Sequence, residues 1–143
     1  MDVEIEYDEW GAGMSETEKI TINLGLVDLG QIDLLVQEGF YSNRTDFIRT
    51  AIRNQLATHA EEVKQTVARK TLVLGLEHYT RRDLETVREA GETLEIRILG
   101  LASIDHDVSP ELARETISSL VVLGALRASQ DVKSALKDRI QSS

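Results

Sequence analysis

The chain lacks several features that would point to particular classes of protein. It contains no cysteine, which excludes disulfide bonds, thiol catalysis and thiolate metal sites. It has no apolar run long enough to cross a bilayer and no secretory signal, so we expect a soluble, cytoplasmic protein without membrane contacts. We also find no nucleophile–base pair, no phosphate-binding glycine loop and no cluster of metal ligands. The sequence therefore predicts a protein that is not an enzyme and needs no cofactor.

Basic residues are also scarce, and the imbalance is concentrated at one end of the chain. Sixteen Lys and Arg oppose 25 Asp and Glu, which gives a formal net charge of −9. Seven of these acids precede the first basic residue, Lys19, and the rest of the chain is close to balanced. We therefore predict a flexible acidic arm over residues 1–17. Val3, Ile5 and Tyr7 alternate with acids there, which also fits a short edge strand docked on another surface.

Residues 18–24 alternate between polar and apolar side chains, the period of a half-buried strand. The apolar set is Ile20, Ile22 and Leu24, and the polar set is Lys19, Thr21 and Asn23. No second strand is evident nearby, so the simplest partner for the open edge is the same strand of a second copy, paired antiparallel. The polar set then faces outward with a cation, a hydroxyl and an amide, which suit phosphates and base edges in the major groove. An ordinary solvated strand face has the same pattern.

Two amphipathic helices follow the strand. Apolar residues at helical spacing predict a first helix over about residues 27–38, ended by Gly39. Asn43 and Asp46 have the spacing of a capping box, with the carboxylate of Asp46 reaching back to Asn43 at the start of a second helix. The apolar pattern of that second helix continues through Val63 and Val67.

The start of the second helix is also a predicted phosphate site. A helix start presents unpaired amides and the positive end of the helix dipole, and Ser42, Asn43 and Arg44 add side-chain donors there. A unit this small cannot bury its apolar faces alone, so we expect an intertwined dimer. Its predicted core consists of Ile20, Ile22, Leu24, Ile32, Leu35, Ile48 and Ile52.

Residues 18–56 resemble a ribbon-helix-helix domain of the CopG and nickel-responsive-regulator type. The resemblance rests on the strand K-I-T-I-N-L and on the turn and helix G-F-Y-S-N-R-T-D-F-I-R-T-A-I-R. It implies a homodimer that inserts a two-stranded antiparallel ribbon into the major groove of a double-stranded DNA operator. By this resemblance Lys19, Thr21 and Asn23 read bases, and the start of the second helix clamps the DNA backbone. It also implies a sequence-specific transcriptional regulator, typically a repressor and often of its own operon.

The acidic arm needs an explanation in a DNA-binding protein, because affinity for DNA comes largely from neutralising phosphates. We hypothesise that the arm, which adjoins the ribbon in sequence, competes with DNA for the basic face and sharpens specificity. A solubilising tail is the alternative. In either case the acidity predicts weak non-specific binding.

The predicted DNA-binding and dimerisation domain covers residues 18–69, and the pattern changes over residues 70–143. Three apolar segments there share a Leu-Gly pair, at residues 71–76, 95–101 and 120–126. Each precedes a short helical segment, over residues 82–90, 110–115 and 130–139, and Ser109-Pro110 is a good helix start. The spacing of about 25 residues is typical of stacked repeats. We predict a small α+β module with three Leu-Gly strand repeats, whose glycines allow a bulge or close backbone approach.

Several roles remain open for this second module. Oligomerisation fits best, because strands with exposed edges could link dimers into tetramers or larger assemblies and raise the effective concentration of DNA contacts. We expect no metal site: His78 and His106 are the candidates, but they lie far apart and lack cysteine partners. A protein partner is a further option, as in an antitoxin that binds its own operator and a toxin. Stacking of the repeats into filaments is another.

Overall fold

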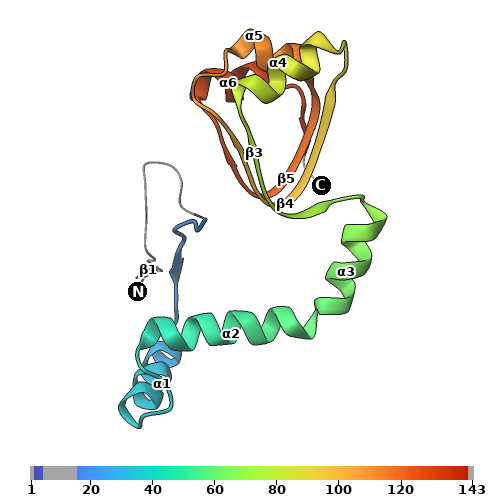
Figure 1. Ribbon diagram of the computed structural model, residues 1–143. Helices are drawn as coiled ribbons and strands as arrows, with labels where there is room; N and C mark the ends of the chain where they lie inside the picture. Colours follow the sequence, from blue (N-terminus) through green and yellow to red (C-terminus); the bar gives the residue numbers. More distant parts are fainter. Residues whose placement is uncertain (1, 5–15, 142–143) are drawn as a thin grey trace. The chain divides into compact units, whose positions relative to one another are not determined.

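The computed structural model describes residues 2–4 and 16–141, which fall into two compact units (Figure 1). Unit 1 is Met1–Gln65 and unit 2 is Thr66–Ser143. Unit 1 contains the strands β1 (Asp2–Glu4) and β2 (Thr21–Asn23) and the helices α1 (Leu26–Gln37) and α2 (Arg44–Thr58). Helix α3 (Ala60–Arg69) contains the boundary between the units. No helix in the described ranges is long and apolar enough to span a membrane.

The predicted strand and first two helices are present in unit 1, with two differences from the expected pattern. Gly39 follows α1 with a φ of 86°, as expected for a glycine that ends a helix in the left-handed conformation. We predicted that the second helix continues through Val63 and Val67, but α2 ends at Thr58 and a new helix begins at Ala60. His59 separates the two with a φ of −105° and a ψ of 15°, outside the helical range.

The second difference concerns the partner of the strand. The prediction that no second strand lies nearby in the chain was wrong, because β1 pairs antiparallel with β2 and places Val3 opposite Ile22. The open edge of a short strand is satisfied by an extended segment of the same chain. The alternative of a short edge strand in the arm is thus confirmed at Val3, whereas Ile5 and Tyr7 lie outside the described residues.

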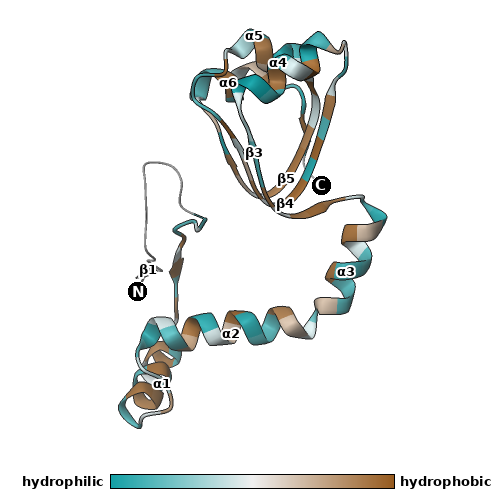
Figure 2. Cartoon of the chain, in the orientation of Figure 1, coloured by the Kyte–Doolittle hydropathy of each residue, from teal (hydrophilic) through white to brown (hydrophobic). Residues whose placement is uncertain are grey.

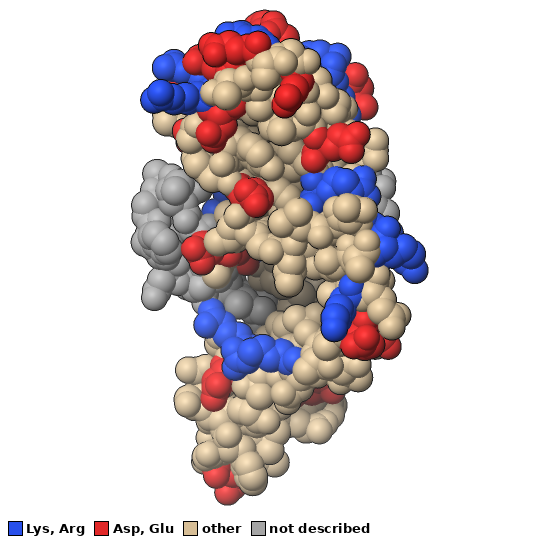
Figure 3. All heavy atoms as spheres, turned by 45° about the vertical axis from the view of Figure 1, so that its right-hand side comes forward, with Lys and Arg blue, Asp and Glu red and all other residues tan. Residues whose placement is uncertain are grey.

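Unit 1 leaves much of its apolar surface uncovered in a single copy. Leu29, Ile32 and Ile48 are buried, and Leu24 and Phe47 pack against the cluster that Leu29 and Ile48 form. Of the predicted dimer core, Ile32 and Ile48 are buried and Leu24 and Leu35 half-buried, whereas Ile20, Ile22 and Ile52 are exposed. On the face shown in Figure 3, the end of unit 1 that contains α1 is largely uncharged. Such apolar surface is typical of a subunit that folds together with a partner.

Unit 2 is a parallel βα repeat. Its elements in chain order are β3 (Val73–Tyr79), α4 (Arg81–Glu89), β4 (Leu94–Ile104), α5 (Pro110–Thr116), β5 (Ile117–Arg127), α6 (Gln130–Ala135) and β6 (Ile140–Gln141). The strands form one parallel sheet in the order β3-β4-β5-β6. The three predicted strands and the helix start at Ser109-Pro110 are confirmed. The last helix ends at Ala135 instead of Arg139, and the short strand β6 was not predicted.

The sheet of unit 2 bends sharply, and the three helices lie across its open end (Figure 1). Gly75, Gly100 and Gly124 are aligned in register across β3, β4 and β5, and all have positive φ. A Cβ on Gly100 would lie 2.1 Å from the carbonyl oxygen of Gly75, and one on Gly124 would lie 2.1 Å from that of Gly100. The Leu-Gly repeats therefore encode a stacked bend that only glycine can form.

Helices α4, α5 and α6 close the core of unit 2 against the inner face of the sheet. The residues of this core that are at most 4% exposed are Leu84, Ile96, Ile98, Ala102, Ile104, Val108, Leu112, Ala113, Ile117, Leu120, Val132 and Leu136. Figure 2 shows that α4, α5 and α6 carry hydrophilic as well as hydrophobic residues, as expected for helices with one face on a core and one in water. Unit 2 thus has a complete interior of its own.

Candidate nucleic-acid interface

The polar row of the ribbon is exposed in the single chain. Thr21 and Asn23 belong to β2, and Lys19 lies two residues before that strand; all three are exposed. Ile20 and Ile22 alternate with them and are 51% and 38% exposed. A ribbon of this kind presents alternate side chains to opposite faces, so one face carries polar groups and the other apolar ones.

The N-terminus of α2 is held by its cap, with one detail different from the prediction. The Asn43 side chain accepts the backbone N–H of Asp46 at 2.8 Å, as predicted for the first residue of a capping box. The Asp46 carboxylate accepts the N–H of Ser42 at 2.9 Å, one residue earlier than the predicted contact with Asn43. The two hydrogen bonds fix the turn that leads into α2.

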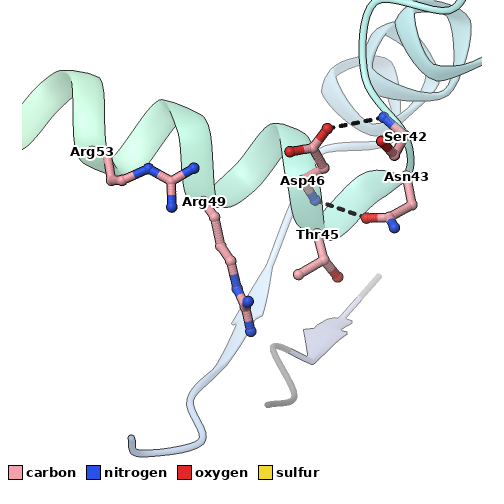
Figure 4. Close-up of a pocket in the computed structure, with 6 residues that line it drawn as sticks. All are labelled: Ser42, Asn43, Thr45, Asp46, Arg49 and Arg53. Carbon is pink, nitrogen blue, oxygen red and sulfur yellow. Dashed lines mark hydrogen bonds between the residues drawn. The ribbon is translucent and has the colours of Figure 1, made fainter. Parts of the chain in front are cut away.

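An open hollow of about 410 Å³ lies beside this turn. It is lined by Ser42, Asn43, Thr45, Asp46, Arg49 and Arg53. Thr45, Arg49 and Arg53 are spaced by four residues, which places them on one side of a helix. Figure 4 shows them in this order along α2, with Asn43 and Ser42 beyond the helix start. The hollow thus combines hydroxyl and amide groups, a helix N-terminus and two guanidinium groups, which suit a phosphate.

Arg44, the third predicted anchor, is not among the residues that line the hollow. Its Nε and one terminal nitrogen donate to the two carboxylate oxygens of Asp33 at 2.7 and 2.8 Å. This bidentate ion pair joins the start of α2 to α1. The hydrogen bond from Arg44 lowers the pKa of Asp33, and the Asp33 carboxylate raises the pKa of Arg44.

Of the predicted phosphate-binding residues, Ser42 and Asn43 line the hollow, and Arg49 and Arg53 line it with them. Reasoning from sequence did not assign these two arginines to the site. The signal that identifies them is the spacing of four residues from Thr45, once the helix start is known. They also offset the charge of Asp46, whose carboxylate lies at the same end of the helix.

In unit 2 the predicted metal candidates do not form a cluster. The described part of the chain contains no group of three or more His, Asp and Glu placed to hold a metal ion. His78 instead contacts two other side chains: its Nδ1 lies 2.6 Å from the Ser103 hydroxyl, and its Nε2 lies 3.0 Å from the Asp105 carboxylate. Sequence reasoning missed this contact because the residues are about 25 positions apart and meet only through the parallel register of β3 and β4.

The comparisons with known proteins identify one family. The model of the ribbon-helix-helix transcriptional regulator family matches residues 15–133, which is most of the chain. No curated protein and no solved structure matches. The match includes β2, the turn and the helices α1 and α2, and it extends through β5 into α6 of unit 2.

Proposed function

Because the chain belongs to the ribbon-helix-helix transcriptional regulator family, we propose that it is a sequence-specific repressor that binds a double-stranded DNA operator as a homodimer. The observation that carries the proposal is the chemistry of β2 and of the two residues before it. One set of side chains, Ile20 and Ile22, is apolar and exposed in a single copy, whereas the alternating set is polar and exposed. Pairing of two copies buries the first set and presents the second to DNA.

The dimer forms through the edge of β2. A strand has two edges, and among the described residues β2 has β1 as its only strand partner. A second copy of β2 either adds to the other edge or replaces β1, and both give an antiparallel pair of β2 strands about a two-fold axis. We propose that it replaces β1, because only this leaves a two-stranded ribbon. Burial of Ile20, Ile22 and Ile52 then drives association, at roughly 25 cal/mol for each Å² of apolar surface removed from water.

The ribbon reads the operator in the major groove, which admits a two-stranded ribbon. Asn23 carries an amide that can bind adenine with two hydrogen bonds, Lys19 can donate to guanine, and Thr21 can contact either purine or the methyl group of thymine. The two-fold axis predicts an operator with two related half-sites.

The hollow at the start of α2 holds the DNA backbone. Ser42 and Asn43 donate to a phosphate at the helix N-terminus, and Arg49 and Arg53 supply the positive charge. Arg44 contributes to the same region through its ion pair with Asp33, which keeps α1 and α2 together while the phosphate is bound. Contacts of this kind position the protein and carry no sequence information.

A repressor fits unit 2 better than an antitoxin. An antitoxin of this class neutralises its toxin with a segment that folds on binding, whereas unit 2 has a parallel sheet and a core of its own. Co-expression with the product of the neighbouring gene, followed by a pull-down, distinguishes the two. A stable complex with that product would favour the antitoxin.

The experiment that tests the proposed function is selection of bound DNA from a random pool, followed by measurement of the mass of the recovered complex. We expect one enriched sequence with two-fold symmetry, bound by an even number of copies. The control is Asn23→Ala, which should enrich a less defined sequence. The proposal would be contradicted if the unaltered chain enriched no particular sequence. It would also be contradicted if the recovered complexes contained a single copy of the chain.

A further inference from the structure

The sheet of unit 2 has an outer face that is only partly covered. In β4 the residues Ile96, Ile98 and Ala102 point into the core and are at most 2% exposed. Leu99 and Leu101 alternate with them, do not belong to the core cluster and are only half-buried. Since successive side chains of a strand point to opposite faces, these leucines lie on the outer face.

The same apolar positions repeat on the neighbouring strands. Register places Leu74, Leu99 and Leu123 in one row and Leu76, Leu101 and Ala125 in the next. Leu74 is 71% exposed and Leu76 is 52% exposed, because β3 is the edge strand. We call these six residues the leucine face. It contains no charged side chain, and Figure 2 shows hydrophobic colour on all three strands near the bend.

A polar row bounds the leucine face on one side. The next outward positions are His78, Ser103 and Arg127, which are aligned across β3, β4 and β5. His78 contacts Ser103 and Asp105 through its two ring nitrogens. An uncharged apolar centre beside a polar rim is the composition of a protein–protein contact surface.

We propose that the leucine face packs against the leucine face of a second copy of this chain. Both of its rows are apolar and uncharged, so the surface can pack against a copy of itself, as a two-fold contact requires. The dimers typical of the family bring a second unit 2 into the same assembly, so the contact forms at a high local concentration. The inference rests on that dimeric state and not on the reading of DNA.

Charge does not oppose a contact between two leucine faces. The chain carries a net charge of −9, so two copies repel each other wherever acidic surfaces meet. The leucine face is a part of unit 2 where that repulsion is absent, whereas charged residues of both signs cover the helical end on the side shown in Figure 3. The leucine face has no positively charged group that could bind an acidic partner or DNA.

Cysteine cross-linking tests the proposal, because the full chain contains no cysteine of its own. Leu99→Cys places a thiol on the central strand of the leucine face, and Glu89→Cys places one on the exposed side of α4 as the matched control. Under mild oxidation without DNA, we expect the Leu99→Cys chains to cross-link to each other at least about tenfold faster than the Glu89→Cys chains.

Equal rates for the two variants would overturn the proposal, as would cross-linking of Leu99→Cys to some other protein alone. A second variant tests the same face in case Leu99→Cys does not fold. Leu76→Cys lies at the edge of the same face, and its circular dichroism and thermal unfolding should match those of the unaltered chain. The DNA selection described above is an independent measurement. If cross-linking fails but an operator is selected, only the leucine-face contact is rejected. If cross-linking occurs but no operator is selected, only the proposed function is rejected.

Discussion

Arg44 and Asp33 form a bidentate ion pair that joins the two helices of unit 1, with nitrogen–oxygen distances of 2.7 and 2.8 Å. The arginine occupies the first position of α2, where we predicted a phosphate contact, and the aspartate lies on α1. The guanidinium of Arg44 already holds a carboxylate in two hydrogen bonds, which it would have to give up to bind a phosphate in the same way. We therefore propose that Arg44 orients the start of α2 and that the polar groups of the hollow bind the DNA backbone.

The first prediction concerns the pH dependence of this ion pair. Asp33 has a pKa below its ordinary value of 3.8 because it accepts hydrogen bonds from Arg44. A carboxyl group with a lowered pKa stabilises the folded state above the ordinary pKa, and this contribution is lost as the pH falls through the lowered value. Asp33→Asn should therefore be less stable than the unaltered chain at pH 7. The difference should shrink below about pH 3.8. Urea unfolding at pH 7 and pH 3 measures this, and a constant difference would show that the pair does not contribute.

The second prediction separates Arg49 from Arg44 in DNA binding. Arg49→Ala removes a charge from the hollow, so it should weaken binding to operator and to random DNA alike. It should reduce the slope of log affinity against log salt by about 1, as expected for one lost phosphate contact. Arg44→Ala is the comparison, and we expect it to lower stability more and the salt slope less. Binding titrations at several salt concentrations measure the slopes. If Arg44→Ala reduced the slope more than Arg49→Ala did, Arg44 and not Arg49 would be the phosphate ligand.

The third prediction concerns base reading by the ribbon. Asn23→Ala should cost about 1–3 kcal/mol on the operator and relax the preference at one base pair in each half-site. Binding to random DNA should change little, because the amide makes no phosphate contact in the proposed complex. Competition between operator variants measures the preference. An equal loss of affinity for every sequence would show that Asn23 does not read bases.

The fourth prediction concerns the acidic arm. Deletion of residues 2–16 removes β1, which pairs with the ribbon strand, together with most of the acids that precede Lys19. We expect random DNA to bind more tightly and the ratio of operator to random affinity to fall, because an anionic competitor next to the ribbon is gone. Unchanged affinities for both kinds of DNA would support the alternative of a solubilising tail.

The fifth prediction concerns the glycine stack of unit 2. Gly100→Ala should destabilise the protein by about 3 kcal/mol or more, because it combines an unfavourable φ with a clash against the carbonyl of Gly75. Gly75→Ala has a similar φ but no atom within 4 Å of the added Cβ, so it should cost less.

A glycine in a helix provides the matched control for these two variants. Gly30 lies within α1 and has no atom within 4 Å of an added Cβ, so Gly30→Ala should stabilise the chain by roughly 0.5–1 kcal/mol. Thermal unfolding of the three variants measures the order. Equal stability of Gly75→Ala and Gly100→Ala would show that the carbonyl contact adds no cost.

Much of unit 1 could be predicted from sequence because its signals are local. The alternation around Thr21, the glycine at position 39 and the cap at Asn43 each act within a few residues. The pairing of β1 with β2 could not be predicted, since it depends on contacts between segments about 20 residues apart. The break at His59 was missed because the apolar pattern continues across it.

In unit 2 the repeated Leu-Gly pairs correctly predicted three strands and a stack, but not how the side chains meet. The contact of His78 with Ser103 and Asp105 depends on the parallel register, which no local pattern contains. The pair of Arg44 and Asp33 was missed for a similar reason, because the two residues belong to different helices. Side-chain partners across elements are set by tertiary packing, which the periodicity of a sequence does not specify.

The central claim is that the outward side chains of β2 enter the major groove of the operator, and site-specific cross-linking tests it most directly. Thr21→Cys places the only thiol of the chain on the ribbon, and the operator from the selection carries a thiol tether on a major-groove base edge in each half-site. We predict that Thr21→Cys forms a disulfide with both half-sites, whereas Glu89→Cys on α4 forms none. Equal cross-linking by the two variants would contradict this claim. So would normal binding of the DNA by Thr21→Cys without formation of a disulfide.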